Sequence, residues 1–137
     1  MDKSLNYMAL ARKAGRIELG EEPVGAAARA QHARLIVVAS DASDHTWRRA
    51  KSFAAGTGQQ VISVPFTKEE LGQAVGRTSL AIAAFTDPAL ALAFVNALEQ
   101  PEKYRDVVTD LDNRSKRIRQ HRAEAKAHIR NKRQGKK

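Results

Sequence analysis

The stretch LIVVASDAS, residues 35–43, places five apolar residues directly before a cluster of turn and helix-capping residues. A continuous apolar run of this length predicts a strand that is buried on both faces, as in a sheet covered by helices on each side. The polar residues that follow favour a loop and the start of a helix over about residues 45–55. This strand–loop–helix unit decides the fold class, because the rest of the first hundred residues follows the same plan.

Helical and strand patterns alternate on both sides of this unit. The spacing of apolar residues, glycines and capping residues predicts four strands, at residues 16–19, 35–39, 61–64 and 80–85. It predicts helices over about residues 5–15, 21–30, 45–55, 67–76 and 87–98. Strands that alternate with helices of this length imply βαβ units, so we expect an α/β fold, a three-layer αβα sandwich.

Two of the expected helices carry specific start signals. Thr67 and Glu70 have the spacing of a capping box, and Phe66 and Leu71 have the spacing of a hydrophobic staple. Asp87 and Pro88 form a capping residue followed by proline, which predicts the start of the last helix of this region.

Charge divides the chain into three parts. Residues 1–100 hold eleven basic and ten acidic residues, a net charge of +1, and residues 101–112 carry −2. Residues 113–137 hold eleven basic residues against Glu124 alone, a net charge of +10. We therefore predict a compact domain at 1–100, a mildly acidic joint at 101–112 and a basic arm at 113–137. The arm has too few hydrophobic residues to fold alone, so we expect it to be disordered or to become helical on binding RNA.

Several classes of function lack support in the sequence. Cysteine is absent, which excludes disulfides and thiolate chemistry, and no apolar run has the length of a signal peptide or a membrane span. Ser43, Asp44 and His45 are neighbours in sequence and are interpreted as a helix-cap cluster, because catalytic triads are assembled in space. We therefore expect a cytoplasmic protein that is not an enzyme, with no cofactor, no metal, no small-molecule substrate and no membrane partner.

Three stretches in this order resemble one family: LARKAG at 10–15, GEE at 20–22 continuing to ASDAS at 39–43, and FTKEELGQAVG at 66–76. Together they resemble the L7Ae/L30e ribosomal-protein superfamily, most closely its bacterial YlxQ-like branch, over about residues 4–98. The resemblance implies an αβα sandwich that binds RNA, often at kink-turns, which are sharp bends built on sheared G·A pairs.

The resemblance also implies an RNA-binding surface in three segments. These are a helix start at Gly20, Glu21 and Glu22, a first loop at Asp41, Ala42 and Ser43, and a second loop at Arg77, Thr78 and Ser79. The chain departs from the kink-turn pattern at Glu22, where Asn is usual, at Pro23, where Glu is usual, and at Ala26, where a Lys would reach guanine. General RNA binding is therefore expected more strongly than kink-turn specificity.

The arm supplies a further set of expected phosphate contacts. They are the basic residues Arg114, Lys116, Arg117, Arg119, Arg122, Lys126, Arg130, Lys132 and Arg133. The expected partner is a structured RNA, ribosomal RNA above all, together with the ribosome. An alternative is a protein-interaction module that the arm holds on the ribosome or another polyanion. Two narrower alternatives stay open: Glu21 and Glu22 can simply satisfy their helix dipole, and Trp47 can be a core residue or a stacking platform for a base.

Overall fold

A computed structural model describes residues 2–55 and 58–134, with side chains up to residue 125. The elements in chain order are α1 (Lys3–Lys13), β1 (Ile17–Leu19), α2 (Glu21–Arg29), β2 (Leu35–Val38), α3 (Asp44–Ala54), β3 (Gln60–Ser63), α4 (Lys68–Ala74), β4 (Ile82–Phe85), α5 (Pro88–Ala97) and α6 (Arg105–Gln134). All four predicted strands and all five predicted helices of the first hundred residues are present, within a few residues of their expected bounds.

The strands form one mixed sheet in the order β1-β4-β2-β3. Strands β1 and β2 both run antiparallel to β4, which lies between them, and β3 runs parallel to β2. The parallel pair is joined through α3, the crossover that the apolar run at 35–39 and its following helix predict. The three carboxyl ends of β1, β2 and β3 therefore share one edge of the sheet with the amino end of β4.

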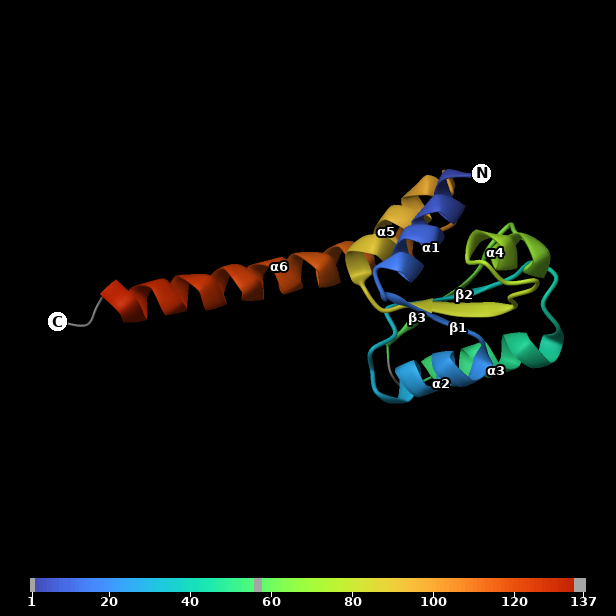
Figure 1. Ribbon diagram of the computed structural model, residues 1–137, viewed down its shortest axis with the longest axis horizontal. Coiled ribbons are helices and arrows are strands. Elements are labelled where there is room, and N and C mark those ends of the chain that lie inside the picture. Colours follow the sequence, from blue (N-terminus) through green and yellow to red (C-terminus); the bar gives the residue numbers. More distant parts are fainter. Residues whose placement is uncertain (1, 56–57, 135–137) are drawn as a thin grey trace.

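Helices cover both faces of this sheet, which confirms the predicted three-layer sandwich (Figure 1). Leu35 and Val37 of β2 belong to the hydrophobic cluster that includes α1, α4 and α5. Ile36 and Val38, which alternate with them, belong to the cluster formed with α2 and α3. Because successive strand side chains point to opposite faces, a strand without polar positions requires an apolar layer on each side.

The predicted start signals have the expected geometry. The capping box of α4 is complete, since Thr67 accepts from the backbone of Glu70 and the Glu70 carboxylate accepts from the backbone of Thr67. The Asp87 carboxylate accepts from the backbone N–H of Leu90 at 3.2 Å at the start of α5. These bonds satisfy backbone donors that the first turn of a helix otherwise leaves without partners.

The core continues past residue 100, where the charge pattern predicts the end of the domain. Tyr104, Val107 and Leu111 are buried in the same cluster as α1 and α5, and the Tyr104 hydroxyl donates to the carbonyl of Ser63 at 3.0 Å. The predicted joint is thus largely the first turns of α6, and its apolar face completes the core.

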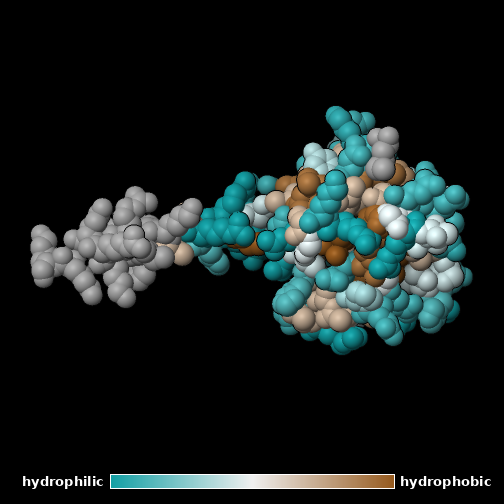
Figure 2. Space-filling view, viewed as in Figure 1, coloured by the Kyte–Doolittle hydropathy of each residue, from teal (hydrophilic) through white to brown (hydrophobic). Residues whose placement is uncertain are grey.

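The basic extension is a helix in the structure, whereas its composition predicts disorder or a helix that forms on binding RNA. Helix α6 runs without a break across the predicted boundary at 112/113 and then leaves the domain (Figure 1). Its described outer part is strongly hydrophilic, whereas the apolar surface of this view lies over the domain (Figure 2).

Candidate nucleic-acid interface

The topology brings all three segments of the expected RNA-binding surface to one edge of the sheet. The backbone N–H of Gly20 donates to the carbonyl of Ile82 at 3.0 Å, and that of Ala39 donates to the carbonyl of Ala81 at 2.9 Å. The segments that follow β1 and β2 therefore both lie beside the start of β4. The loop at residues 76–79 leads directly into this strand, so it lies at the same edge.

The start of α2 presents backbone donors at this edge. Gly20 is the N-cap, with φ of 96° and no side chain to accept from the first turn. Within the described chain, no acceptor is present for the backbone N–H groups of Glu21 and Glu22, and Pro23 has no N–H to offer. Two free donors at the positive end of a helix dipole suit an anion or a polar base edge.

Arg77 lies against this helix start. Its Nη1 atom is 3.8 Å from the position that a Cβ on Gly20 would occupy, so the guanidinium and the free N–H groups are neighbours. The loop is held there by Gly72, whose carbonyl accepts from the backbone of Arg77 at 2.8 Å. Thr78 and Ser79 are exposed beside it. The structure therefore combines the first and third predicted segments into one surface.

The two glutamates of this surface differ in their surroundings. Glu21 forms an ion pair with Arg49 of α3 at 2.7 Å and lies 3.8 Å from His45. Its carboxylate therefore ties α2 to α3, and only its backbone faces outward as a free donor. Glu22 is exposed and has no ion-pair partner among the described residues. An unpaired carboxylate in the first turn of α2 disfavours a phosphate at that point and suits a base edge with N–H donors.

The loop at residues 41–43 shows mainly structural roles. The Asp41 carboxylate accepts from the backbone of Lys68 at 2.8 Å, which fixes the start of α4, and Ser43 accepts from the backbone of Thr46 at 3.1 Å as the N-cap of α3. Ala42 is half-buried against both clusters. These side chains shape the edge, and one oxygen of Asp41 and the hydroxyl of Ser43 are already hydrogen-bonded within the domain.

The arm residues also separate into two groups. Arg114 is only 21% exposed, pairs with Asp110 at 2.9 Å and donates to the carbonyl of Gly58 at 2.8 Å. Lys116 pairs with Asp112 at 2.9 Å. Arg117, Arg119 and Arg122 are exposed, and none of the ion pairs in the described chain involves them. The predicted contacts at Lys126, Arg130, Lys132 and Arg133 lie outside the described side chains.

Trp47 has a mixed environment. Its ring packs against the cluster under α2 and α3, while the ammonium of Lys51 lies 5.1 Å from the ring centroid. This placement favours the core interpretation, because one face of the ring is packed and a cation covers the ring.

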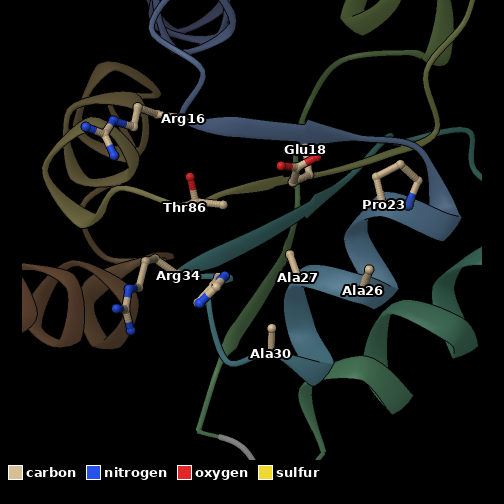
Figure 3. A pocket seen from close by; sticks show the side chains of 9 residues that line it. Arg16, Glu18, Pro23, Ala26, Ala27, Ala30, Arg34 and Thr86 are labelled. Atoms are coloured by element: carbon tan, nitrogen blue, oxygen red, sulfur yellow. The ribbon is translucent and has the colours of Figure 1, made fainter.

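A pocket that the sequence does not predict lies between β1 and α2 (Figure 3). It has a volume of about 470 Å³ and combines alanines of α2 with polar residues at the ends of three strands. Only the fold brings these residues together, and no spacing in the sequence marks them. Among the residues that the structure describes, no group of three His, Asp or Glu could hold a metal ion, and no helix is long and apolar enough to cross a membrane.

Two solved structures are similar to this chain. A protein of unknown function from Bacillus halodurans is 23% identical, with a TM-score of 0.67, over 73% of this chain and 100% of its own. The 15.5kD RNA binding protein of Giardia lamblia is 18% identical, with a TM-score of 0.58, over 72% of this chain and 84% of its own. These likenesses show the αβα fold. No curated protein sequence matches the chain.

A match to a protein-family model shows the family of this chain. It matches residues 2–93, which include every element from α1 to β4 and most of α5. This range contains all three segments at the sheet edge and ends before α6. The chain therefore belongs to the Ribosomal protein L7Ae/L30e/S12e/Gadd45 family.

Proposed function

We propose that this protein binds a structured RNA, with ribosomal RNA as the first candidate, through the sheet edge that carries the start of α2 and the loop at 76–79. The observation that carries the proposal is the approach of Arg77 to Gly20, which joins a cation to the free N–H groups of Glu21 and Glu22. The family, and the RNA binding named for the Giardia relative, support the same conclusion.

Helix α6 has an auxiliary role in this proposal. Its exposed cations Arg117, Arg119 and Arg122 attract phosphates with little selectivity, so they add affinity that salt weakens. Recognition of RNA shape then belongs to the edge. A kink-turn RNA is the preferred probe of that recognition. In this proposal the protein is cytoplasmic, associates with the ribosome and belongs to the bacterial YlxQ-like branch of the family.

Replacement of Arg77 tests the proposal directly. We expect Arg77→Gln to weaken binding of a kink-turn RNA about fivefold or more, because a charge-assisted hydrogen bond to RNA is lost. Arg48→Gln is the matched control, since Arg48 is an exposed arginine on α3 outside the edge. If both substitutions have equal, small effects on RNA affinity in a titration, the sheet edge does not bind the RNA.

A protein-interaction module is the second candidate, and Ala26 favours it. This position holds a small apolar side chain on the outward face of α2, so that face lacks the cation that would reach a guanine. In that case the domain would bind a partner protein, and α6 would hold the domain on RNA. The same pair of variants separates the two candidates, because Arg77→Gln would then leave RNA affinity near the value of the control.

A further inference from the structure

The pocket between β1 and α2 exists because the helical layer does not cover the outermost strand. Ile17 and Leu19 of β1 point into the core formed with α1 and α5, which leaves Glu18 on the opposite face. Helix α2 and its C-cap offer only Pro23 and the small side chains of Ala26, Ala27 and Ala30 to that face. They cannot fill the space beneath β1, and a cavity of about 470 Å³ remains, within the range of small-molecule sites.

Polar side chains from three strand ends line this cavity, and two of them are charged. Arg16 precedes β1, Arg34 precedes β2 and Thr86 follows β4, and all three line it (Figure 3). Their backbones are fixed to one another, since Thr86 donates to the carbonyl of Arg16 at 2.9 Å and Arg34 donates to that of Phe85 at 2.7 Å. The two arginine backbones are therefore held at the rigid end of the sheet, and Figure 3 shows their side chains extending from it on either side of Thr86.

The ionisable groups of the pocket are not paired with one another. No ion pair of the described chain involves Arg16, Arg34, Glu18 or His32, although all four line one cavity. The Nε atom of Arg34 is buried and has no hydrogen-bond partner in the described structure. That atom is closed to solvent, so a ligand in the cavity would meet the outer part of the half-buried Arg34 side chain and not its Nε atom.

The distribution of charge indicates what kind of ligand fits. Arg16 and Arg34 suit a phosphate at the strand ends, whereas the exposed Glu18 carboxylate would repel a second phosphate in the same cavity. The alanines offer a flat apolar wall between these two ends. A molecule with a phosphate at one end, a flat ring in the middle and N–H donors at the other end matches all three features.

We propose that this pocket binds a guanine nucleotide, with its phosphate on Arg16 and Arg34 and the base edge on Glu18. A carboxylate has two acceptor oxygens, and guanine presents two neighbouring donors, N1–H and the N2 amino group. Adenine, cytosine and uracil each place an acceptor beside their donor, which would face a carboxylate oxygen. The pocket reaches from Pro23, in the first turn of α2, to the opposite end of the sheet, and neither Glu18 nor the two arginines belongs to the RNA-binding edge. The proposal therefore does not rest on RNA binding at the edge.

Two sources could supply this ligand, a free mononucleotide or an unpaired guanosine within an RNA strand. Titration of the full chain with guanosine monophosphate, followed by ¹H–¹⁵N NMR, tests the shared chemistry. We expect shifts concentrated at the pocket residues and affinity about tenfold higher than for adenosine monophosphate. Equal affinity for the two nucleotides, equal competition by inorganic phosphate, or shifts scattered outside the pocket would each overturn the proposal.

Substitutions in the pocket test which residue contacts the base and which contacts the phosphate. Glu18→Gln should reduce the preference for the guanine nucleotide to within about twofold, because one acceptor oxygen becomes a donor. Arg16→Gln should weaken the binding of both nucleotides equally. Glu102→Gln and Arg105→Gln are the matched controls, since both residues are exposed outside the pocket. If Glu18→Gln keeps the full preference while its thermal unfolding is unchanged, the base is not on Glu18.

The two sources are distinguished with the pentanucleotides UUGUU and UUAUU. Tighter binding of UUGUU than of guanosine monophosphate, lost in Glu18→Gln, would support a guanosine within RNA. Equal binding of the two pentanucleotides, with the mononucleotide preference intact, would support a free nucleotide.

Discussion

Gly72 packs its Cα atom directly against the backbone of the loop that carries Arg77. A Cβ at this position would lie 2.7 Å from the Arg77 carbonyl oxygen and 2.8 Å from the Ser79 nitrogen. Both are backbone atoms of the segment that enters β4, so they cannot move aside as a flexible side chain would. Glycine is therefore required here for close packing, and the position of Arg77 depends on it.

We expect Gly72→Ala to destabilise the protein by about 1–3 kcal/mol and also to weaken RNA binding, because the loop must shift. Urea unfolding and an RNA titration measure the two effects. Gly15→Ala is the control: its φ of +68° strains alanine, but nothing lies within 4 Å of the added Cβ. It should lower stability without changing RNA affinity, and the same loss of affinity in both variants would contradict this role for Gly72.

Asp2 gives a pH-dependent prediction at the other end of the chain. Hydrogen bonds from the Ser4 hydroxyl and then from the Ser4 backbone lower the pKa of the Asp2 carboxyl below its usual 3.8. A lowered pKa in the folded state stabilises the protein fully above the ordinary value, and this contribution is lost as pH falls through the lowered pKa. The stability difference between the native protein and Asp2→Asn, measured by urea unfolding, should be constant above pH of about 4 and shrink below it. A difference that grows on acidification would be contrary to this sign.

Roles of single residues were the hardest feature to predict from sequence. The capping box at Thr67 and Glu70 was readable because its two bonds are local. The pairing of Glu21 with Arg49 has no such local pattern, because the two residues are 28 positions apart along the chain. Charge alone predicts Arg114 as an arm contact, whereas the i,i+4 spacing to Asp110 predicts the ion pair that the structure has.

Helix α6 has two parts with different physical roles. Its first turns bury Val107 and Leu111 in the core, and its outer part carries cations that project from the domain. Composition predicts the second part but not the first, because the net charge of −2 at 101–112 hides an apolar face at helical spacing.

The buried part of α6 is tested by truncating a side chain. Leu111→Ala should lower the free energy of unfolding by about 2–5 kcal/mol, because it leaves a cavity in a fully buried site. Ile118→Ala, at a half-buried position further along α6, should cost about 1 kcal/mol or less. If both variants unfold at the same denaturant concentration, the first turns of α6 do not complete the core.

The projecting part is tested through salt. Neutralising Arg117, Arg119 and Arg122 together as glutamines should flatten the log–log salt dependence of RNA binding by about 2, if each contacts one phosphate of a single strand. The thermal unfolding midpoint should not change, since these side chains are exposed. Arg114→Gln is the contrasting variant, and it should lower stability because it loses bonds to Asp110 and Gly58. An unaltered slope in the triple variant would exclude the electrostatic role of α6.

At the scale of the whole molecule, the sequence predicts the architecture well because the apolar patterns are local. The all-apolar β2 demands a layer on each face, and the clusters on either side of it confirm this. The strand order places β4 between β1 and β2, and this order determines which loops share an edge. The pocket behind β1 follows from the same order, which no local pattern contains.

A substitution at Ala26 tests whether this chain can bind a kink-turn as the relatives with a lysine at this position do. We expect Ala26→Lys to strengthen binding to a kink-turn RNA about fivefold or more, because a lysine there can donate to guanine. Ala30→Lys adds the same charge one turn further along α2, beside the same pocket, and should have a smaller effect. Equal gains from both substitutions would mean that the added charge acts without base contact.

The central claim is that the sheet edge recognises RNA shape while α6 adds charge. It is tested most directly with the full chain carrying glutamine at positions 117, 119 and 122, because the first turns of α6 must stay to complete the core. This variant is titrated near physiological salt with a kink-turn RNA and with a matched duplex that lacks the G·A pairs. We expect clear preference for the kink-turn, and the further substitution Arg77→Gln should reduce that preference about fivefold or more. Equal and weak binding of both RNAs would contradict it.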